Sequence, residues 1–288
     1  MRGVKRAPMA FWVLDSWPDT LKAVGAVRSR FFLLLIDKLV AFIYRRCDLI
    51  LAQSKSFVAQ IKHYVGNKQK LGYLPSWAED LYGNSIVLPA SEVPVKPGCF
   101  NVMFAGNIGD AQDFPAILEA ASRLKTHEQI RWLVVGDGRL GAWVKEEIQR
   151  RELQNCVLML GRFPVERMPS FFKHAQALLV SLKDEPIFSM TIPGKLQSYL
   201  ASGLPVVAML NGEGADLVVE SKVGLACAAG DSEALAAAVL RLSQMPIEER
   251  EKMGRNGLAL SLREFNRDEL MNRLERWLEE LVASRLAV

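Results

Sequence analysis

Short apolar, β-branched segments alternate with helical segments from residue 101 onward. This alternation is typical of successive βα units on one parallel sheet, where a helix returns the chain to the same edge between strands. Strands are expected at residues 102–105, 130–135, 157–160, 177–181, 206–209 and 224–227, and helices at 114–124, 143–151, 195–201 and 232–242. These six units predict one complete doubly wound α/β domain.

A shorter α/β pattern precedes residue 100. Its expected elements are strands at residues 11–14, 49–52 and 71–74, a long helix within 21–45, and a helix from the N-cap candidate Ser54 to about Tyr64. That is about half of a second α/β domain. Pro89, Pro94 and Pro97 mark residues 89–98 as the linker between the two.

Two further helical patterns follow, over residues 248–261 and 268–281. In the second, Leu270, Leu274 and Trp277 recur at helical spacing. Such a stripe is typical of a helix that packs on a core, and we favour that interpretation over a partner-binding helix.

The composition is that of a globular protein, since half of the 288 residues are hydrophobic and 24% are charged. Disordered, collagen-like and disulfide-rich classes are therefore excluded. The cysteines and histidines are scattered without metal-ligand spacing, at Cys47, Cys99, Cys156, Cys227, His63, His127 and His174. We expect reduced thiols and no metal site.

Positive charge is concentrated at the start of the chain. Residues 1–70 contain 13 Lys and Arg against 4 Asp and Glu, whereas the remaining residues contain 23 against 28. This asymmetry suggests that the first segment faces something anionic, such as a membrane surface or a phosphate-bearing acceptor. A solvated basic surface is the alternative, and nucleic acid is not expected as a partner.

Residues 29–46 combine an apolar middle with basic residues at both ends. A helix of this kind suits the surface of an anionic membrane, close to a lipid-linked acceptor. The alternative, which we favour, is that its apolar face covers the sheet of the first domain. Asp37 and Lys38 interrupt the apolar run, which is too short to span a bilayer, and no signal peptide is recognisable. We expect a cytoplasmic protein, peripheral on the inner face of the cytoplasmic membrane if this segment binds there.

The sequence Gly136-Asp137-Gly138-Arg139-Leu140-Gly141 matches G-x-G-x-x-G between a strand and a helix, as in dinucleotide sites. It follows the second strand of its domain rather than the first, and Gly161-Arg162 stands where an acidic residue would bind a ribose hydroxyl. NAD is therefore not expected. The turn should still face a ligand, because the carboxyl ends of parallel strands open on one crevice.

Two other turns point to a bound phosphate group. Gly106-Asn107-Ile108-Gly109 follows the first strand of the complete domain, and its glycines would let backbone amides approach a diphosphate. In Pro193-Gly194-Lys195, a proline and a glycine start a helix that carries a lysine in its first turn. A lysine there opposes the helix dipole, so a bound anion explains it better than folding does.

These turns, together with Asp15-Ser16-Trp17-Pro18, residues 182–188, Gly212-Glu213-Gly214-Ala215 and Gly230-Asp231, carry a resemblance in consistent order along the chain. The sequence resembles family 4 glycosyltransferases of bacterial surface-polysaccharide synthesis, near the L-fucosamine transferase-like branch. The resemblance implies the GT-B fold, an α/β architecture with two Rossmann-like domains facing a cleft, here with an incomplete N-terminal domain. It also implies retaining, metal-independent transfer of a sugar from a nucleotide diphosphate, with UDP favoured, to a lipid-linked or saccharide acceptor.

The resemblance divides the chain into four parts. Residues 1–88 would form a partial N-terminal, acceptor-side domain, 89–98 the linker, 99–265 the nucleotide-sugar-binding domain, and 266–288 a helix crossing back toward the first domain. About the first hundred residues of the family's first domain have no counterpart. A recorded start that is too late, a separate completing chain and a decayed fragment are the three interpretations. Donor binding is expected to survive in a fragment, whereas catalysis would depend on an acceptor site and transition-state groups in the missing portion.

The resemblance also implies the roles of individual residues. Lys195 would neutralise the departing phosphate, with Arg162 as a second catalytic cation. The implied donor-binding residues are Gly106, Asn107, Gly109, Gly136, Gly138, Arg139, Gly161, Ser189, Thr191, Gly194 and Ser198. Gly161 and Arg162 would lie near the base, and Ser189 to Thr191 near the donor sugar. No cofactor and no metal ion are implied.

The sequence departs from the family pattern at two places. The broad family has two glutamates eight residues apart, where this chain has Met190 and Ser198, and Ser198 is expected to bind the ribose. An Arg/Lys pair after the first strand is replaced by Asp110-Ala111-Gln112-Asp113. Lys195 would then supply the positive charge, with Arg139, Arg162 or Lys183 as helpers.

Two other functions remain open from the sequence. One is a non-catalytic nucleotide-sugar-binding or partner subunit. The other is a nucleotide-sugar 2-epimerase of the same architecture, which would need acid–base carboxylates and histidines in the cleft. The scattered histidines give the epimerase little support.

Overall fold

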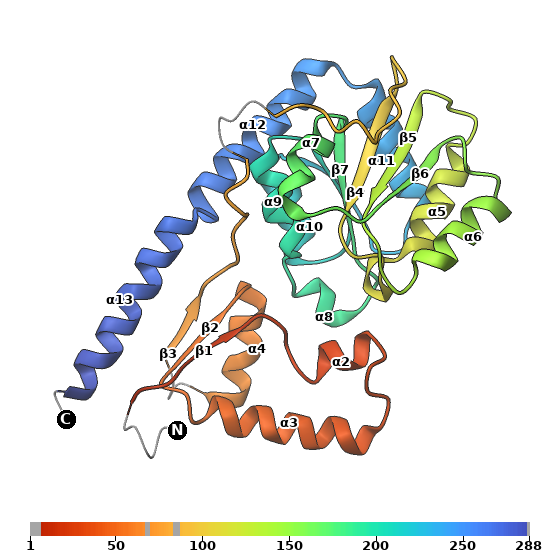
Figure 1. Cartoon of the computed structure of the whole chain (residues 1–288). Helices are drawn as coiled ribbons and strands as arrows, with labels where there is room; N and C mark the ends of the chain where they lie inside the picture. Colours follow the sequence, from red (N-terminus) through yellow and green to blue (C-terminus); the bar gives the residue numbers. More distant parts are fainter. Residues whose placement is uncertain (1–6, 67–69, 83–86, 287–288) are drawn as a thin grey trace. The chain divides into compact units, whose positions relative to one another are not determined.

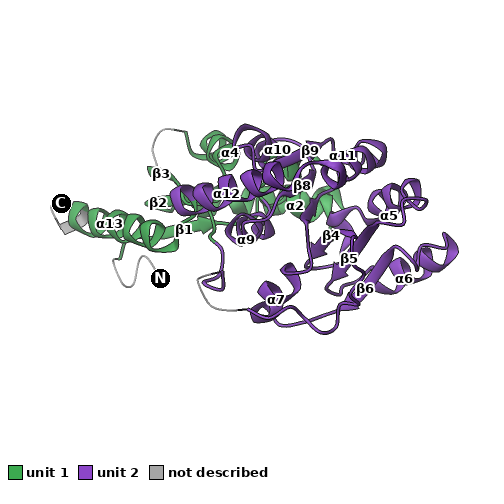
Figure 2. Cartoon of the chain, turned by 90° about the horizontal axis from the view of Figure 1, so that it is seen from above, with its two compact units in different colours: residues 1–77, 185–192, 265–288 green, residues 78–184, 193–264 purple. Residues whose placement is uncertain are grey.

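The computed structural model describes residues 7–66, 70–82 and 87–286 (Figure 1). The chain divides into two compact units, coloured separately in Figure 2. The first comprises the residues up to Trp77, residues 185–192 and the residues from Phe265, and the second comprises residues 78–184 and 193–264. Within the predicted first domain, residues 1–6, 67–69 and 83–86 lie outside the described residues.

The first unit contains a parallel sheet in the order β1-β2-β3, formed by Ala10–Val13, Leu49–Ala52 and Lys70–Tyr73. Its helices are α2 (Asp19–Ala23), α3 (Arg30–Tyr44), α4 (Lys55–Val65), α8 (Pro186–Ser189) and α13 (Arg267–Leu286). The three predicted strands are confirmed to within one residue. Ser54 is confirmed as an N-cap, because its Oγ accepts a hydrogen bond from the Phe57 amide at 3.1 Å.

The apolar stripe of α13 packs on this sheet. Leu270 is buried in a cluster with Leu49, Leu51 and Leu74. A Cβ atom placed on Gly72, in β3, would stand 3.1 Å from the Trp277 indole, so the glycine leaves room for that ring. The C-terminal helix therefore contributes to the core of the first unit.

The second unit contains a six-stranded parallel sheet in the order β6-β5-β4-β7-β8-β9. The strands are β4 (Phe100–Ala105), β5 (Ile130–Val135), β6 (Val157–Gly161), β7 (Ala177–Ser181), β8 (Val206–Met209) and β9 (Gly224–Cys227). All six predicted strands are confirmed. The strand order reverses beside β4, and ligands of open α/β sheets bind at such a switch point, outside the carboxyl ends of the strands.

Helices complete the second unit (Figure 1). They are α5 (Phe114–Arg123), α6 (Gly141–Arg150), α7 (Met168–Phe172), α9 (Gly194–Ser202), α10 (Glu213–Glu220), α11 (Ser232–Gln244) and α12 (Ile247–Glu264), with 3-10 turns at Asp110–Gln112 and Val165–Arg167. One face of β4, β5 and β7 packs on α5, α6 and α11 in a single apolar core. The short helices α7, α8 and α10 were not predicted. No helix in the described ranges has the length and hydrophobicity needed to cross a bilayer.

The boundaries of the units differ from the predicted domain boundaries. Residues 89–98 belong to the second unit, because Ala90 is buried, its amide donates to Ser170 O at 3.1 Å, and Arg131 Nη1 donates to Pro94 O at 2.8 Å. Residues 185–192 belong to the first unit, where Ser54 Oγ donates to Met190 O at 2.6 Å. The prolines suggested a linker at residues 89–98, but this segment packs on the second unit and forms hydrogen bonds with it.

Candidate functional site

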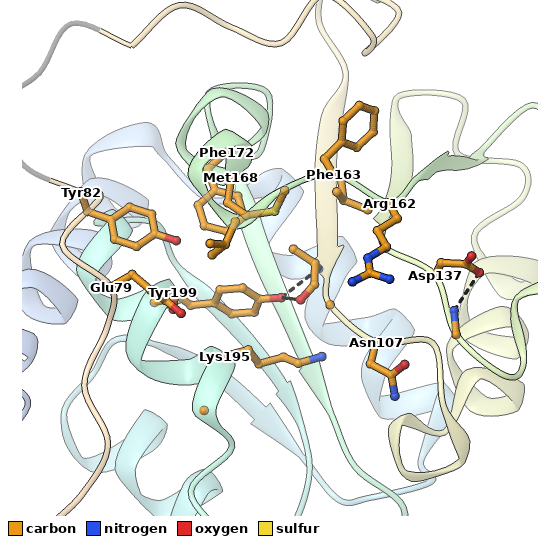
Figure 3. A pocket seen from close by; sticks show the side chains of 18 residues that line it. Glu79, Tyr82, Asn107, Asp137, Arg162, Phe163, Met168, Phe172, Lys195 and Tyr199 are labelled. Carbon is orange, nitrogen blue, oxygen red and sulfur yellow. Dashed lines mark hydrogen bonds between the residues drawn. The ribbon is translucent and has the colours of Figure 1, made fainter.

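A cavity of about 650 Å³ opens in the second unit, beside the carboxyl end of β4 (Figure 3). Its lining comes from the ends of β4 and β5, the segment after β6, helix α9, and the irregular segment before β4. The lining residues are Glu79, Tyr82, Ala105, Gly106, Asn107, Val135, Gly136, Asp137, Gly138, Arg162, Phe163, Val165, Met168, Phe172, Gly194, Lys195, Ser198 and Tyr199. The cavity therefore lies at the switch point of the sheet, where a ligand is expected.

The two glycine turns of the lining interlock. Gly106 and Gly136 adopt φ values of +143° and +142°, and a Cβ atom on Gly136 would stand 1.9 Å from Gly106 O. The Ile108 amide donates to Asp137 O at 2.9 Å, which ties one turn to the other. Gly136 is required because an added Cβ would collide with the Gly106 backbone, and both positions favour glycine because L side chains rarely adopt these φ values.

Several amides of these turns donate to acceptors within the protein. Gly106 N donates to Val135 O, and Gly136 N donates to Gly161 O, at 2.9 and 2.7 Å. Gly138 N donates to Asp137 Oδ1 at 2.7 Å, and Gly109 N donates to Gln112 Oε1 at 3.1 Å. In this structure, the glycines thus shape the wall of the cavity, and the positive charge of the site comes from side chains.

Lys195 lies in the first turn of α9, and its Nζ is 3.7 Å from the centre of the Phe104 ring. The side chain is partly exposed, but Nζ itself is buried and has no hydrogen-bond partner among the described residues. Burial lowers the pKa of Lys195 to about 7. An anion in the cavity would favour the charged form of this amine.

Aromatic side chains form another part of the wall. Tyr199 OH accepts from Ala105 N at 2.9 Å and donates to Ala105 O at 3.1 Å, which fixes α9 to the end of β4. Tyr82 stacks on Phe172 with ring centres 5.9 Å apart. Together with Phe163, these rings provide an apolar surface suited to a flat ligand ring.

A carboxylate also faces the cavity. Ser198 Oγ donates to Glu79 Oε2 at 3.0 Å. Burial and the Glu79 charge both raise the pKa of Tyr82. Glu79 and Tyr82 were missed in the sequence, because they lie in an irregular segment that carries no motif.

Eight of the residues expected at the donor site line this cavity: Gly106, Asn107, Gly136, Gly138, Arg162, Gly194, Lys195 and Ser198. Gly109, in the turn after β4, and Gly161, the last residue of β6, do not line it. Arg162 extends into the cavity (Figure 3). The sequence motifs thus converge on one place in the second unit.

The other expected residues lie elsewhere. Arg139 is outside the lining and pairs with Asp110, whose pKa it holds below the usual range. Ser189 and Thr191 belong to the first unit, where their hydroxyls donate to Pro186 O and Ile187 O at 2.8 and 2.9 Å. Within the described residues, no three His, Cys, Asp or Glu side chains gather in a way that could hold a metal ion.

Comparison with known families identifies the family of the chain. The model of the family described as glycosyl transferases group 1 matches residues 99–245, more than half of the 288 residues. The chain belongs to this family. All the lining residues of the cavity except Glu79 and Tyr82 lie within the matched segment.

Two relatives of this group 1 chain have names that refer to glycosyl transfer. A probable glycosyltransferase of Pseudomonas aeruginosa, WbjE, is 24% identical over an alignment of 246 residues that covers 82% of this chain and 60% of WbjE. The amylovoran biosynthesis glycosyltransferase AmsK of Erwinia amylovora is 34% identical over 114 residues, 39% of this chain and 28% of AmsK. The chain therefore spans 60% or less of the length of these relatives.

Solved structures confirm the fold class. HepE of Anabaena, solved in complex with UDP and glucose, has a TM-score of 0.72 at 17% identity, over 96% of this chain and 73% of HepE. The α/β fold with parallel sheets, expected from the resemblance to GT-B glycosyltransferases, is thus confirmed.

Proposed function

We propose that this chain is a glycosyltransferase that transfers a sugar from a UDP-linked donor to a saccharide or lipid-linked acceptor in surface-polysaccharide synthesis. The observation that carries this proposal is the buried Lys195 amine, which has no hydrogen-bond partner in the described part of the chain and lies in an aromatic-walled cavity at the switch point of the sheet. Lys195 offers charge to a diphosphate, and the aromatic wall offers stacking to a base. Family membership and the printed names of WbjE, AmsK and HepE support the same reading.

The proposed reaction breaks the bond between the anomeric carbon of the sugar and the diphosphate oxygen. Negative charge develops on that oxygen, and the side chains of Lys195 and Arg162 neutralise it. The acceptor hydroxyl forms the new bond to the anomeric carbon and gives up its proton to the departing phosphate. Following the family resemblance, we propose that the anomeric configuration is retained and that no metal ion or cofactor is needed.

Calorimetric titration of the purified chain with UDP, GDP and NAD tests the donor site. We expect UDP to bind and NAD not to bind. Binding of NAD, or a folded chain that binds neither nucleoside diphosphate, would overturn the proposal. A chain that binds UDP but transfers no sugar to any acceptor would instead be a nucleotide-sugar-binding subunit. Loss of sugar transfer after addition of a chelator would show that the reaction needs a metal ion.

We also propose that α3 lies on an anionic membrane surface near the acceptor. Val40 and Tyr44 on one side of the helix are buried, as expected for a helix that covers a sheet. Another side exposes an apolar stripe that includes Lys38, with Phe31, Phe32, Leu34, Leu35, Leu39 and Phe42 each 48–65% exposed. A helix that is apolar on two sides needs a second covering surface.

The charge around this stripe supports anionic lipid as the proposed covering surface. Arg28, Arg30 and Lys38 are exposed around the stripe, and the Arg46 guanidinium lies 3.4 Å from the centre of the Phe42 ring. Basic side chains beside exposed aromatic and leucine side chains are typical of helices that lie in the membrane interface. The proposed location is therefore peripheral, on the cytoplasmic face of the membrane.

A further inference from the structure

The cavity of the second unit has a cationic part and an anionic part. Lys195 and Arg162 carry positive charge into it, whereas Glu79 carries a carboxylate. In Figure 3, Glu79 and Tyr82 lie at one end of the drawn lining, and Asn107 and Asp137 lie at the other. A diphosphate is attracted to the cations and repelled by Glu79, so the ligand must present a different group to the Glu79 end.

Glu79 is oriented to accept hydrogen bonds. Ser198 Oγ donates a hydrogen bond to Glu79 Oε2 at 3.0 Å. A carboxylate has about four acceptor positions, and this hydrogen bond occupies one of them. A ligand group at Glu79 is therefore expected to be a donor. In a nucleoside diphosphate, both the ribose hydroxyls and the base N–H groups are donors.

The spacing along α9 distinguishes these two groups. Lys195 and Ser198 are three residues apart on one helix, so they lie on the same face and about 4.5 Å apart along its axis. The group held by Ser198 and Glu79 must then be adjacent to the group held by Lys195. In a nucleoside diphosphate the ribose is bonded directly to the phosphate chain, whereas the base lies beyond it.

We propose that Glu79, positioned by Ser198, accepts hydrogen bonds from the ribose hydroxyls and makes this site selective for ribonucleotides over deoxyribonucleotides. The inference rests on the proposed nucleotide-sugar function. It also revises the role expected for Ser198, since the carboxylate that position 198 lacks is supplied by a residue 119 positions earlier in the chain.

The test is calorimetric titration of the whole chain with UDP, 2′-deoxy-UDP and 3′-deoxy-UDP. We expect UDP to bind about 10- to 100-fold more tightly than at least one deoxy analogue, a range that matches a hydrogen bond to a charged group. In Glu79→Ala, UDP affinity should fall by a similar factor, and UDP and the analogues should then bind alike. Glu79→Gln keeps an acceptor oxygen but loses the charge, so its affinity for UDP should lie between those of the parent chain and Glu79→Ala.

Asp80→Ala provides the matched control, because Asp80 is an exposed carboxylate beside Glu79 that does not line the cavity. This variant should bind all three nucleotides as the parent chain does. Equal affinity of the parent chain for UDP and both analogues would overturn the role of Glu79 and leave the proposed function intact. If Glu79→Ala still discriminates between UDP and its deoxy analogues, the role of Glu79 is likewise overturned and the proposed function stands. A parent chain that binds no UDP would overturn both proposals.

Discussion

The amine of Lys195 lies over the Phe104 ring, 3.7 Å from its centre, with no hydrogen-bond partner among the residues that the structure describes. The ring face attracts a cation, but it does not replace the water that burial removes. The charged form is therefore incompletely stabilised until an anion enters the cavity. Both the affinity for a diphosphate and its dependence on pH follow from this pair.

Replacing Lys195 with alanine should weaken UDP binding by more than about 1 kcal/mol, because a charge-assisted contact to phosphate is lost. Calorimetry with UDP measures the effect. Lys145→Ala is the control, since Lys145 is an exposed lysine on α6 that does not line the cavity, and it should bind UDP normally. Unchanged affinity in Lys195→Ala would remove this residue from the site.

UDP binding should be coupled to proton uptake above neutral pH. Burial lowers the pKa of Lys195 to about 7, so above that pH the amine is largely neutral in the free protein. A bound diphosphate raises this pKa, so one proton is taken up and the affinity falls as the pH rises above about 7. Below that pH the amine is already charged, and the coupling disappears.

Titrations at about pH 8 in buffers of different ionisation enthalpy measure this uptake, which should approach about one proton. Lys195→Met, which keeps an unbranched side chain without the amine, should show none. A parent chain that takes up no proton at this pH would contradict a neutral Lys195 in the free protein.

The sequence was sufficient to predict most of the second unit. In β5, β7 and β8 every residue is buried, and all are apolar except Arg131 and Ser181, so the ends of each strand are clear. The glycine motifs were recognised individually, but their interlocking was not, because the contact of Gly136 with Gly106 O depends on how β4 and β5 pair.

The remainder of the site depends on tertiary packing. Glu79 has no motif around it, and only the fold brings it to Ser198, 119 residues later. Ser189 and Thr191 were placed from their position in the family pattern, whereas hydrogen bonds and packing assign residues 185–192 to the first unit. Local patterns indicate where strands end, but they do not indicate which irregular segments fold back onto them.

Gly136→Ala should destabilise the second unit by about 2 kcal/mol or more, because its Cβ would meet Gly106 O at 1.9 Å and its φ is +142°. Gly194→Ala is the matched control. It also lines the cavity, but nothing lies within 4 Å of an added Cβ, so its stability should be unchanged. Denaturant unfolding measures the free energy of unfolding of both variants. Equal values would show that the turns at Gly106 and Gly136 can move apart at no cost.

Leu270→Ala should destabilise the first unit by about 2–4 kcal/mol, because the buried side chain is lost from the cluster that joins α13 to the sheet. Leu278→Ala, on the same helix but 40% exposed, should change stability by less than about 0.5 kcal/mol. Unfolding monitored by limited proteolysis of α13 distinguishes the two. Equal effects would mean that α13 does not contribute its stripe to this core.

The exposed stripe of α3 should bind anionic vesicles, with a contribution from charge and a contribution from apolar contact. The parent chain should pellet with phosphatidylserine-containing vesicles at low salt and be released at about 1 M salt, where the Debye length falls to about 3 Å. The double variant Phe31→Glu and Leu34→Glu should pellet weakly, because it puts negative charge into the stripe. Leu262→Glu, at a 68% exposed position of α12, should pellet like the parent. Absence of pelleting at low salt, or equal pelleting with uncharged vesicles, would exclude an anionic membrane as the surface that covers α3.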